Sequence, residues 1–85
     1  MIKLFTGQTC TACTALKGRL IKMGLTDYVE CDISDDTHKD SILALGFRSI
    51  PVLVKYGPTD NVVATLGGNL HTDAEYIELF KGSMK

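Results

Sequence analysis

The sequence has few cysteines, no long apolar run and no secretion signal, and each absence excludes a class of protein. Three cysteines occur in 85 residues, whereas a small secreted disulfide scaffold usually has a larger, even number. No apolar run approaches the length that crosses a bilayer. The segment Met1–Phe5 lacks the long apolar core and small-residue cleavage site of a signal peptide. We therefore expect a soluble protein of the reducing cytoplasm.

An excess of one charge is also absent. The chain has nine Lys and Arg residues and ten Asp and Glu residues. Because these charges nearly balance, the sequence predicts no general attraction to nucleic acid or to a membrane. The charges are unevenly spread, because no acidic residue precedes Asp27 and six acidic residues then fall within 27–40. We interpret the two stretches as solvated faces of opposite sign. The length predicts one domain, residues 1–85, near the lower limit for a self-sufficient core.

The apolar pattern predicts seven elements. Strands are expected over residues 2–5, 28–33, 51–56 and 62–66, and helices over residues 9 or 10 to 23, 35–45 and 73–80. The first strand–helix–strand unit requires parallel strands and a right-handed crossover, and the closing hairpin makes the sheet mixed. The order β-α-β-α-β-β-α therefore predicts an α/β domain with a four-stranded mixed sheet and three helices.

Two of the expected helices begin at residues that suit a cap. Ser34 can cap the second helix, and Thr72 with Glu75 forms the capping-box pattern at the start of the third. The third helix is expected to bury three residues, Tyr76, Ile77 and Phe80.

The feature that carries chemistry is the pair Cys10 and Cys13, between the first expected strand and the first expected helix. Two cysteines at this spacing can close a small disulfide ring if the backbone turns into a helix, and in this context the motif indicates redox chemistry. Free N–H groups at the helix start favour an anion, which lowers the pKa of Cys10 and makes a reactive thiolate. We expect Cys10 to be the nucleophile and Cys13, one turn along and facing inward, the resolving thiol.

The third cysteine, Cys31, alternates with Val29 and Ile33 and is predicted to pack in the core. A zinc site made of the three cysteines with His38 or His71 would need a second close pair of ligands, which the sequence lacks. We therefore predict no metal site, and we assign no chemistry to either histidine.

Three segments together resemble glutaredoxins, which have the shortest form of the thioredoxin fold. They are Phe5–Cys13, Gly46–Val52 and Leu66–Gly68. Their spacing fits over essentially the whole chain. Residues 32–51 are most similar to NrdH-redoxins, glutaredoxin-sized proteins that reduce ribonucleotide reductase and accept electrons from thioredoxin reductase. The resemblance implies a minimal thioredoxin fold and a small, monomeric dithiol oxidoreductase that reduces protein disulfides and holds no tightly bound cofactor.

The same resemblance implies a substrate site. It implies a cis Ile50–Pro51 bond that exposes the Ile50 backbone beside the sulfurs, where a peptide or glutathione pairs as an added strand. Arg48 and Lys17 are candidates for a positive charge near a substrate carboxylate. The substrate-binding residues that we expect are Thr11, Lys17, Arg48, Ile50, Pro51, Gly67 and Gly68.

The sequence departs from glutaredoxins at two glutathione contacts. Gly7 stands where glutaredoxins often have a lysine, and no acidic residue closely follows Gly68. Thr11 and Ala12 replace the usual Pro and Tyr between the cysteines. We therefore expect reduction by thioredoxin reductase, with glutathione as a possible but weaker co-substrate. The alternative is an iron–sulfur cluster carrier, in which two subunits and two glutathione molecules hold the cluster.

Overall fold

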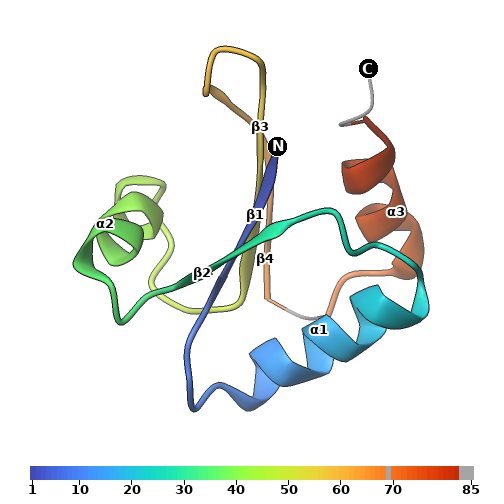
Figure 1. Cartoon of the computed structure of the whole chain (residues 1–85), viewed down its shortest axis with the longest axis horizontal. Coiled ribbons are helices and arrows are strands. Elements are labelled where there is room, and N and C mark those ends of the chain that lie inside the picture. The colour runs from blue at the N-terminus through green and yellow to red at the C-terminus, as the bar shows by residue number, and fades with distance from the viewer. Residues whose placement is uncertain (69, 83–85) are drawn as a thin grey trace.

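The computed structural model describes residues 1–68 and 70–82 (Figure 1). Its elements are β1 (Ile2–Thr6), α1 (Thr11–Lys22), β2 (Val29–Asp32), α2 (Asp36–Ala44), β3 (Val52–Tyr56), β4 (Val62–Gly67) and α3 (Asp73–Gly82). The expected order β-α-β-α-β-β-α is confirmed. Among these helices none is long and apolar enough to cross a bilayer.

The four strands form one sheet in the order β2-β1-β3-β4. β1 runs parallel to β2 and antiparallel to β3, and β3 is antiparallel to β4. The mixed sheet expected from the sequence is therefore confirmed. In Figure 1, α1 and α3 lie on one side of the sheet and α2 lies on the other.

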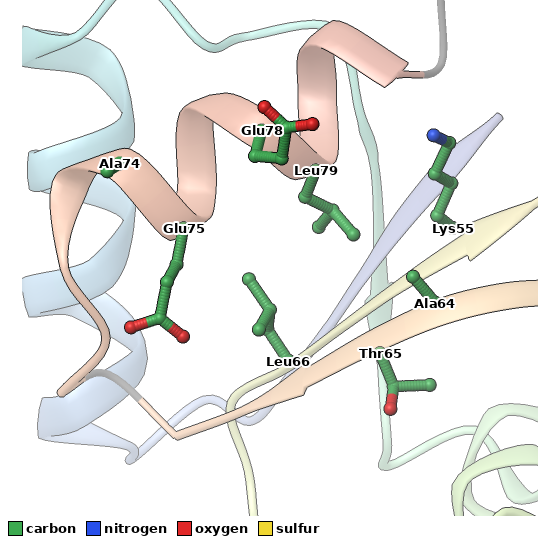
Figure 2. A pocket seen from close by; sticks show the side chains of 8 residues that line it. All are labelled: Lys55, Ala64, Thr65, Leu66, Ala74, Glu75, Glu78 and Leu79. Carbon is green, nitrogen blue, oxygen red and sulfur yellow. The ribbon is translucent and has the colours of Figure 1, made fainter.

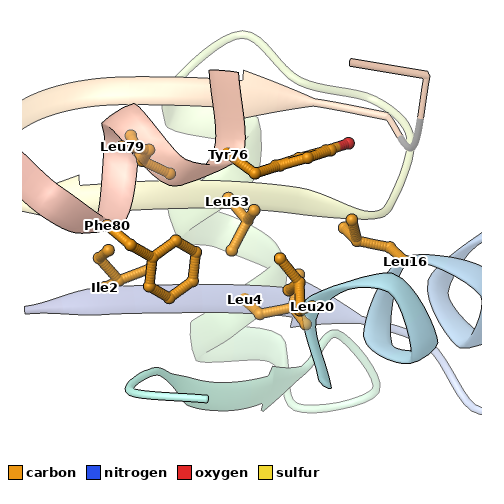
Figure 3. Close-up of a cluster of buried hydrophobic side chains, with 8 residues drawn as sticks. All are labelled: Ile2, Leu4, Leu16, Leu20, Leu53, Tyr76, Leu79 and Phe80. Atoms are coloured by element: carbon orange, nitrogen blue, oxygen red, sulfur yellow. The ribbon is translucent and has the colours of Figure 1, made fainter. Parts of the chain in front are cut away.

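The larger core lies between the sheet and the helices α1 and α3 (Figure 3). Alternation along β1 sends Ile2 and Leu4 to this face, and the three-and-four spacing of α1 brings Leu16 and Leu20 onto them. The buried members of this cluster are Ile2, Leu4, Leu16, Leu20, Leu53, Tyr76, Leu79 and Phe80. This packing fixes α1, and with it the start of the helix where Cys10 lies.

A smaller core lies on the face that α2 covers. It contains Phe5, Cys31, Ile42, Val52 and Val54. The prediction that Cys31 packs in the core is confirmed, since only 3% of it is exposed. Burial raises the pKa of the Cys31 thiol, because a thiolate would lose its hydration there. Cys31 is therefore held in the form that does not react.

Two local predictions are wrong. The cap of α2 is Asp35, whose side chain accepts from the Thr37 N–H at 2.8 Å, rather than Ser34. The Ser34 N–H instead donates to the Asp32 side chain at 2.8 Å. This bond closes a tight turn between β2 and α2, and the helix begins after it. On α3, Ile77 is 44% exposed, because the buried stripe follows Tyr76, Leu79 and Phe80.

The capping box of α3 is confirmed. The Glu75 N–H donates to Thr72 Oγ1 at 3.3 Å, and the Thr72 N–H donates to Glu75 Oε1 at 3.2 Å. Each side chain thus satisfies a backbone group that the helix start leaves unpaired.

The packing of α1 predicts a contrast between two adjacent residues. Leu20 is fully buried whereas Ile21 is 63% exposed. We expect Leu20→Ala to lower the free energy of unfolding by about 2–5 kcal/mol through loss of burial and creation of a cavity. We expect Ile21→Ala, the matched control, to change it by less than about 0.5 kcal/mol. Urea unfolding followed by circular dichroism measures both, and equal losses would contradict the assignment of this face.

Candidate redox site

Cys10 and Cys13 are joined by a disulfide at the start of α1. Cys10 is the N-cap residue and is partly exposed, whereas Cys13 lies in the first turn and is 1% exposed. The two Cα atoms are 5.2 Å apart, a separation that suits a disulfide. The site therefore presents one sulfur at the surface and keeps the other inside.

The helix start supplies a hydrogen-bond donor to the outer sulfur. The Cys13 N–H donates to Cys10 Sγ at 3.1 Å, and the first turn of α1 has no acidic residue. Orphan N–H groups and the helix dipole favour a negative charge at this position. After reduction, the same geometry stabilises the Cys10 thiolate.

The segment before β3 lies beside the disulfide. The Ile50 carbonyl oxygen is 3.9 Å from Cys10 Sγ, and the Ile50–Pro51 bond is cis, as the resemblance implies. The Gly68 N–H donates to the Pro51 carbonyl at 2.7 Å. The structure thus brings together five of the expected site residues, Cys10, Cys13, Ile50, Pro51 and Gly68, from the start of α1, the segment before β3 and the residue after β4.

Two glycines allow this close approach. A Cβ atom on Gly7 would lie 2.6 Å from Ile50 Cδ1, and a Cβ atom on Gly67 would lie 2.9 Å from Phe47 Cε1. Both positions therefore require a residue without a side chain unless the neighbour moves. The space where glutaredoxins often have a lysine is filled here by Ile50.

The charged candidates are placed differently. Lys17 Nζ lies 3.1 Å from Glu30 Oε2 on β2, and the same oxygen accepts from Thr6 Oγ1 at 3.1 Å. The basic and acidic stretches of the sequence meet at this pair, which is exposed enough to contribute less than about 1 kcal/mol to stability. Arg48 and Thr11 are exposed, Arg48 in the loop before Ile50 and Thr11 at the start of α1.

A hollow of about 400 Å³ lies beside Cys10 and Ile50. It is lined by Gly7, Gln8, Thr9, Cys10, Asp32, Ile33, Ser34, Lys39 and Ile50. The sequence reasoning did not select Asp32, Ser34 or Lys39. The pairing of β1 with β2 could have indicated Asp32, because Thr6 at the end of β1 pairs with Asp32 at the end of β2. Hydrogen bonds from Ser34, chiefly from its backbone N–H, hold the pKa of Asp32 below its ordinary value.

A groove larger than this hollow lies elsewhere, between β4 and α3 (Figure 2). It has a volume of about 620 Å³ and is lined by Lys55, Ala64, Thr65, Leu66, Ala74, Glu75, Glu78 and Leu79. None of these residues belongs to the redox motif or to the Ile50–Pro51 segment. Size therefore does not identify the reactive site in this molecule. Among the described residues, no group of three or more His, Cys, Asp or Glu side chains could hold a metal ion.

Comparison with solved structures identifies the fold. The chain is similar to thioredoxin f from spinach chloroplast in its short form, with 17% identity, a TM-score of 0.73, and coverage of 99% of this chain and 75% of that one. It is similar to the glutaredoxin-like protein NrdH-redoxin from Escherichia coli, with 23% identity, a TM-score of 0.66, and coverage of 84% and 95%. No family model and no curated protein matches the sequence. The chain has the thioredoxin fold, and this fold with a bonded Cys10–Cys13 pair supports thiol–disulfide chemistry.

The geometry predicts which thiol reacts first after reduction. We expect iodoacetamide at neutral pH to alkylate Cys10 at least about tenfold faster than Cys13 or Cys31, because Cys10 is the exposed sulfur with a helix start behind it. Peptide mapping by mass spectrometry at short reaction times measures the three rates. The Cys10→Ser variant is the control and should lose the fast phase. Comparable early modification at Cys31 would contradict this reading of the site.

Proposed function

We propose that this chain is a dithiol oxidoreductase that reduces protein disulfides, acting as a monomer in the cytoplasm, with ribonucleotide reductase as a substrate. The observation that carries the proposal is the disulfide between a surface sulfur and a buried one, 3.9 Å from an available backbone carbonyl. NrdH-redoxin, a similar structure, is described as having a thioredoxin-like activity profile, which supports the same reading.

The reaction begins from the reduced form. The Cys10 thiolate attacks one sulfur of the substrate disulfide, the substrate S–S bond breaks, and the second substrate sulfur leaves as a thiolate that takes up a proton. Cys13 then loses its proton, and its thiolate attacks Cys10 Sγ. The mixed disulfide breaks and releases the first substrate sulfur. The substrate has gained two electrons and two protons, and the protein holds the Cys10–Cys13 disulfide seen in the structure.

The substrate is held through its main chain. An extended segment beside the target disulfide pairs with the backbone of Ile50, as an added strand does. Gly67 and Gly68 form the second wall of this groove, linked to Pro51 by the hydrogen bond from Gly68. Main-chain pairing requires little of the substrate's side chains, which suits a reductant of folded proteins.

The electron donor that we propose is thioredoxin reductase rather than glutathione. Arg48, Lys17 and Asp73 are the charged groups that could replace the missing glutathione contacts. Two of them are already paired, since Lys17 binds Glu30 and Asp73 binds Arg19 at 2.6 Å, and Arg48 is exposed in the loop before Ile50. A charge-assisted hydrogen bond contributes about 1.5–3 kcal/mol, so loss of two such contacts lowers the affinity for glutathione at least about tenfold.

The roles proposed for Cys10 and Cys13 predict different behaviour when each is replaced by serine. We expect Cys13→Ser to accumulate a mixed disulfide with a disulfide-bearing protein through Cys10, because nothing resolves it. We expect Cys10→Ser to be inactive. Cys31→Ser is the matched control and should turn over at the wild-type rate, because Cys31 lies in the core on the α2 side of the sheet. Mass spectrometry of the trapped species decides the matter, and trapping through Cys31 would refute the assignment.

The choice of reductant predicts a comparison of initial rates. At matched substrate, we expect efficient turnover with the host thioredoxin reductase and NADPH, and weak turnover with glutathione and glutathione reductase. Gly7→Lys should raise the glutathione rate only if the Ile50 side chain turns away, because a Cβ atom at residue 7 would lie 2.6 Å from Ile50 Cδ1. Strong glutathione turnover without any response to thioredoxin reductase would place the chain with ordinary glutaredoxins instead.

A further inference from the structure

His71, to which the sequence analysis assigns no chemistry, connects the end of β4 to the start of α3. Its Nε2 atom lies 2.7 Å from the Gly67 carbonyl oxygen, and its Nδ1 atom lies 2.9 Å from Glu75 Oε2. The ring also meets the edge of the Tyr76 ring, at 5.8 Å between centroids and an angle of 87°. Both ring nitrogens are therefore within hydrogen-bond distance of an oxygen.

Both of those oxygens are acceptors. A carbonyl oxygen has no proton to donate, and hydrogen bonds, first from the Thr72 backbone N–H and then from His71, lower the pKa of Glu75 and keep its carboxylate ionised. A neutral imidazole has one N–H and can satisfy only one of the two acceptors. The imidazolium donates from both nitrogens and satisfies both. The complete bridge from Gly67 to Glu75 therefore requires a protonated His71.

The bridge holds the wall of the proposed substrate groove. Gly67 pairs with Val52 in the sheet, and Gly68 donates its N–H to Pro51. The Gly68 carbonyl accepts from the Tyr76 hydroxyl at 3.4 Å. His71 thus fixes the Gly67 carbonyl group. The next residue, Gly68, bonds to Pro51, and the preceding Ile50 carbonyl lies beside Cys10.

The charged surroundings of His71 come from three elements. On α3, Glu75 faces the ring directly and Tyr76 meets it edge-on. On α1, Arg19 lies over the Tyr76 ring at 5.0 Å and pairs with Asp73, which neutralises the charge on that side. On β4, the facing group is the Gly67 carbonyl. The nearest charged group to the imidazole in these contacts is thus the Glu75 carboxylate.

We propose that His71 is a positioning residue whose protonated form fixes the Gly67–Gly68 wall and thereby sets the affinity for disulfide-bearing substrates. The link to substrate affinity rests on the proposed function. The effect of His71 protonation on the position of Gly67 and Gly68 does not rest on the proposed function, and it can be tested without any substrate.

The first experiment uses the oxidised protein, in which Cys10 and Cys13 are bonded and do not titrate. Proton–nitrogen NMR spectra are recorded between pH 5 and 8. We expect the amide resonances of Gly67 and Gly68 to shift with the same midpoint as the His71 ring resonances. The shift should disappear in His71→Gln and persist in His38→Gln, which removes the other histidine. Glycine resonances that stay constant while His71 titrates, or that still shift in His71→Gln, would overturn the proposal.

The second experiment measures steady-state reduction of a protein disulfide. We expect His71→Ala to raise KM about fivefold, the effect of one lost hydrogen bond, with kcat within twofold of wild type. In His71→Gln the side-chain amide can donate to the Gly67 carbonyl at any pH. KM should therefore return to the wild-type value, and the change of KM with pH that His71 causes in the wild type should be absent. Unchanged KM in His71→Ala would refute the role in substrate affinity. If the wild-type protein reduces no disulfide, the proposed function fails, and the NMR titration still decides whether His71 controls the wall.

Discussion

The redox site depends on the antiparallel pairing of β1 with β3. In this register Phe5, near the end of β1, lies opposite Val52, at the start of β3. The chain leaves β1 into the segment that carries the cysteines, and it enters β3 from the segment that carries Ile50 and Pro51. Both segments must therefore leave the sheet at the same end of its strands. The two cores hold this pairing from both faces, because Leu4 packs against α1 and α3 while Phe5 packs on the side of α2.

Local patterns in the sequence predicted the elements that depend on neighbours along the chain. The Thr72–Glu75 capping box and the order of strands and helices both follow from residues within a few positions of each other. The failures have a different origin. Asp35 rather than Ser34 caps α2, since Asp32 already accepts from the Ser34 N–H, and a choice between two adjacent capping residues depends on the preceding turn.

The remaining features arise from contacts between distant residues. Ile77 and Leu79 are both apolar, and packing of α3 through Tyr76, Leu79 and Phe80 leaves Leu79 buried and Ile77 exposed. The Gly7 contact with Ile50 and the His71 contact with Gly67 join segments whose distance the sequence does not state. A family resemblance supplied the cis Ile50–Pro51 bond, which the structure confirms, and composition or periodicity alone would not have shown it.

The surface beside Cys10 combines backbone groups with a few charged side chains. Gly7 and Gly67 lack side chains where Ile50 and Phe47 lie close, and the Ile50 carbonyl oxygen is 3.9 Å from Cys10 Sγ. Asp32 and Lys39 line the hollow at Cys10, whereas Lys17 is paired with Glu30 and Arg19 with Asp73. A small peptide with charges at its ends needs complementary charges to be held, whereas an extended protein segment can be held by main-chain pairing over several residues. In the function that we propose, main-chain pairing at Ile50 therefore holds a protein disulfide, and the position of the Gly67–Gly68 wall is the control that we propose on its binding.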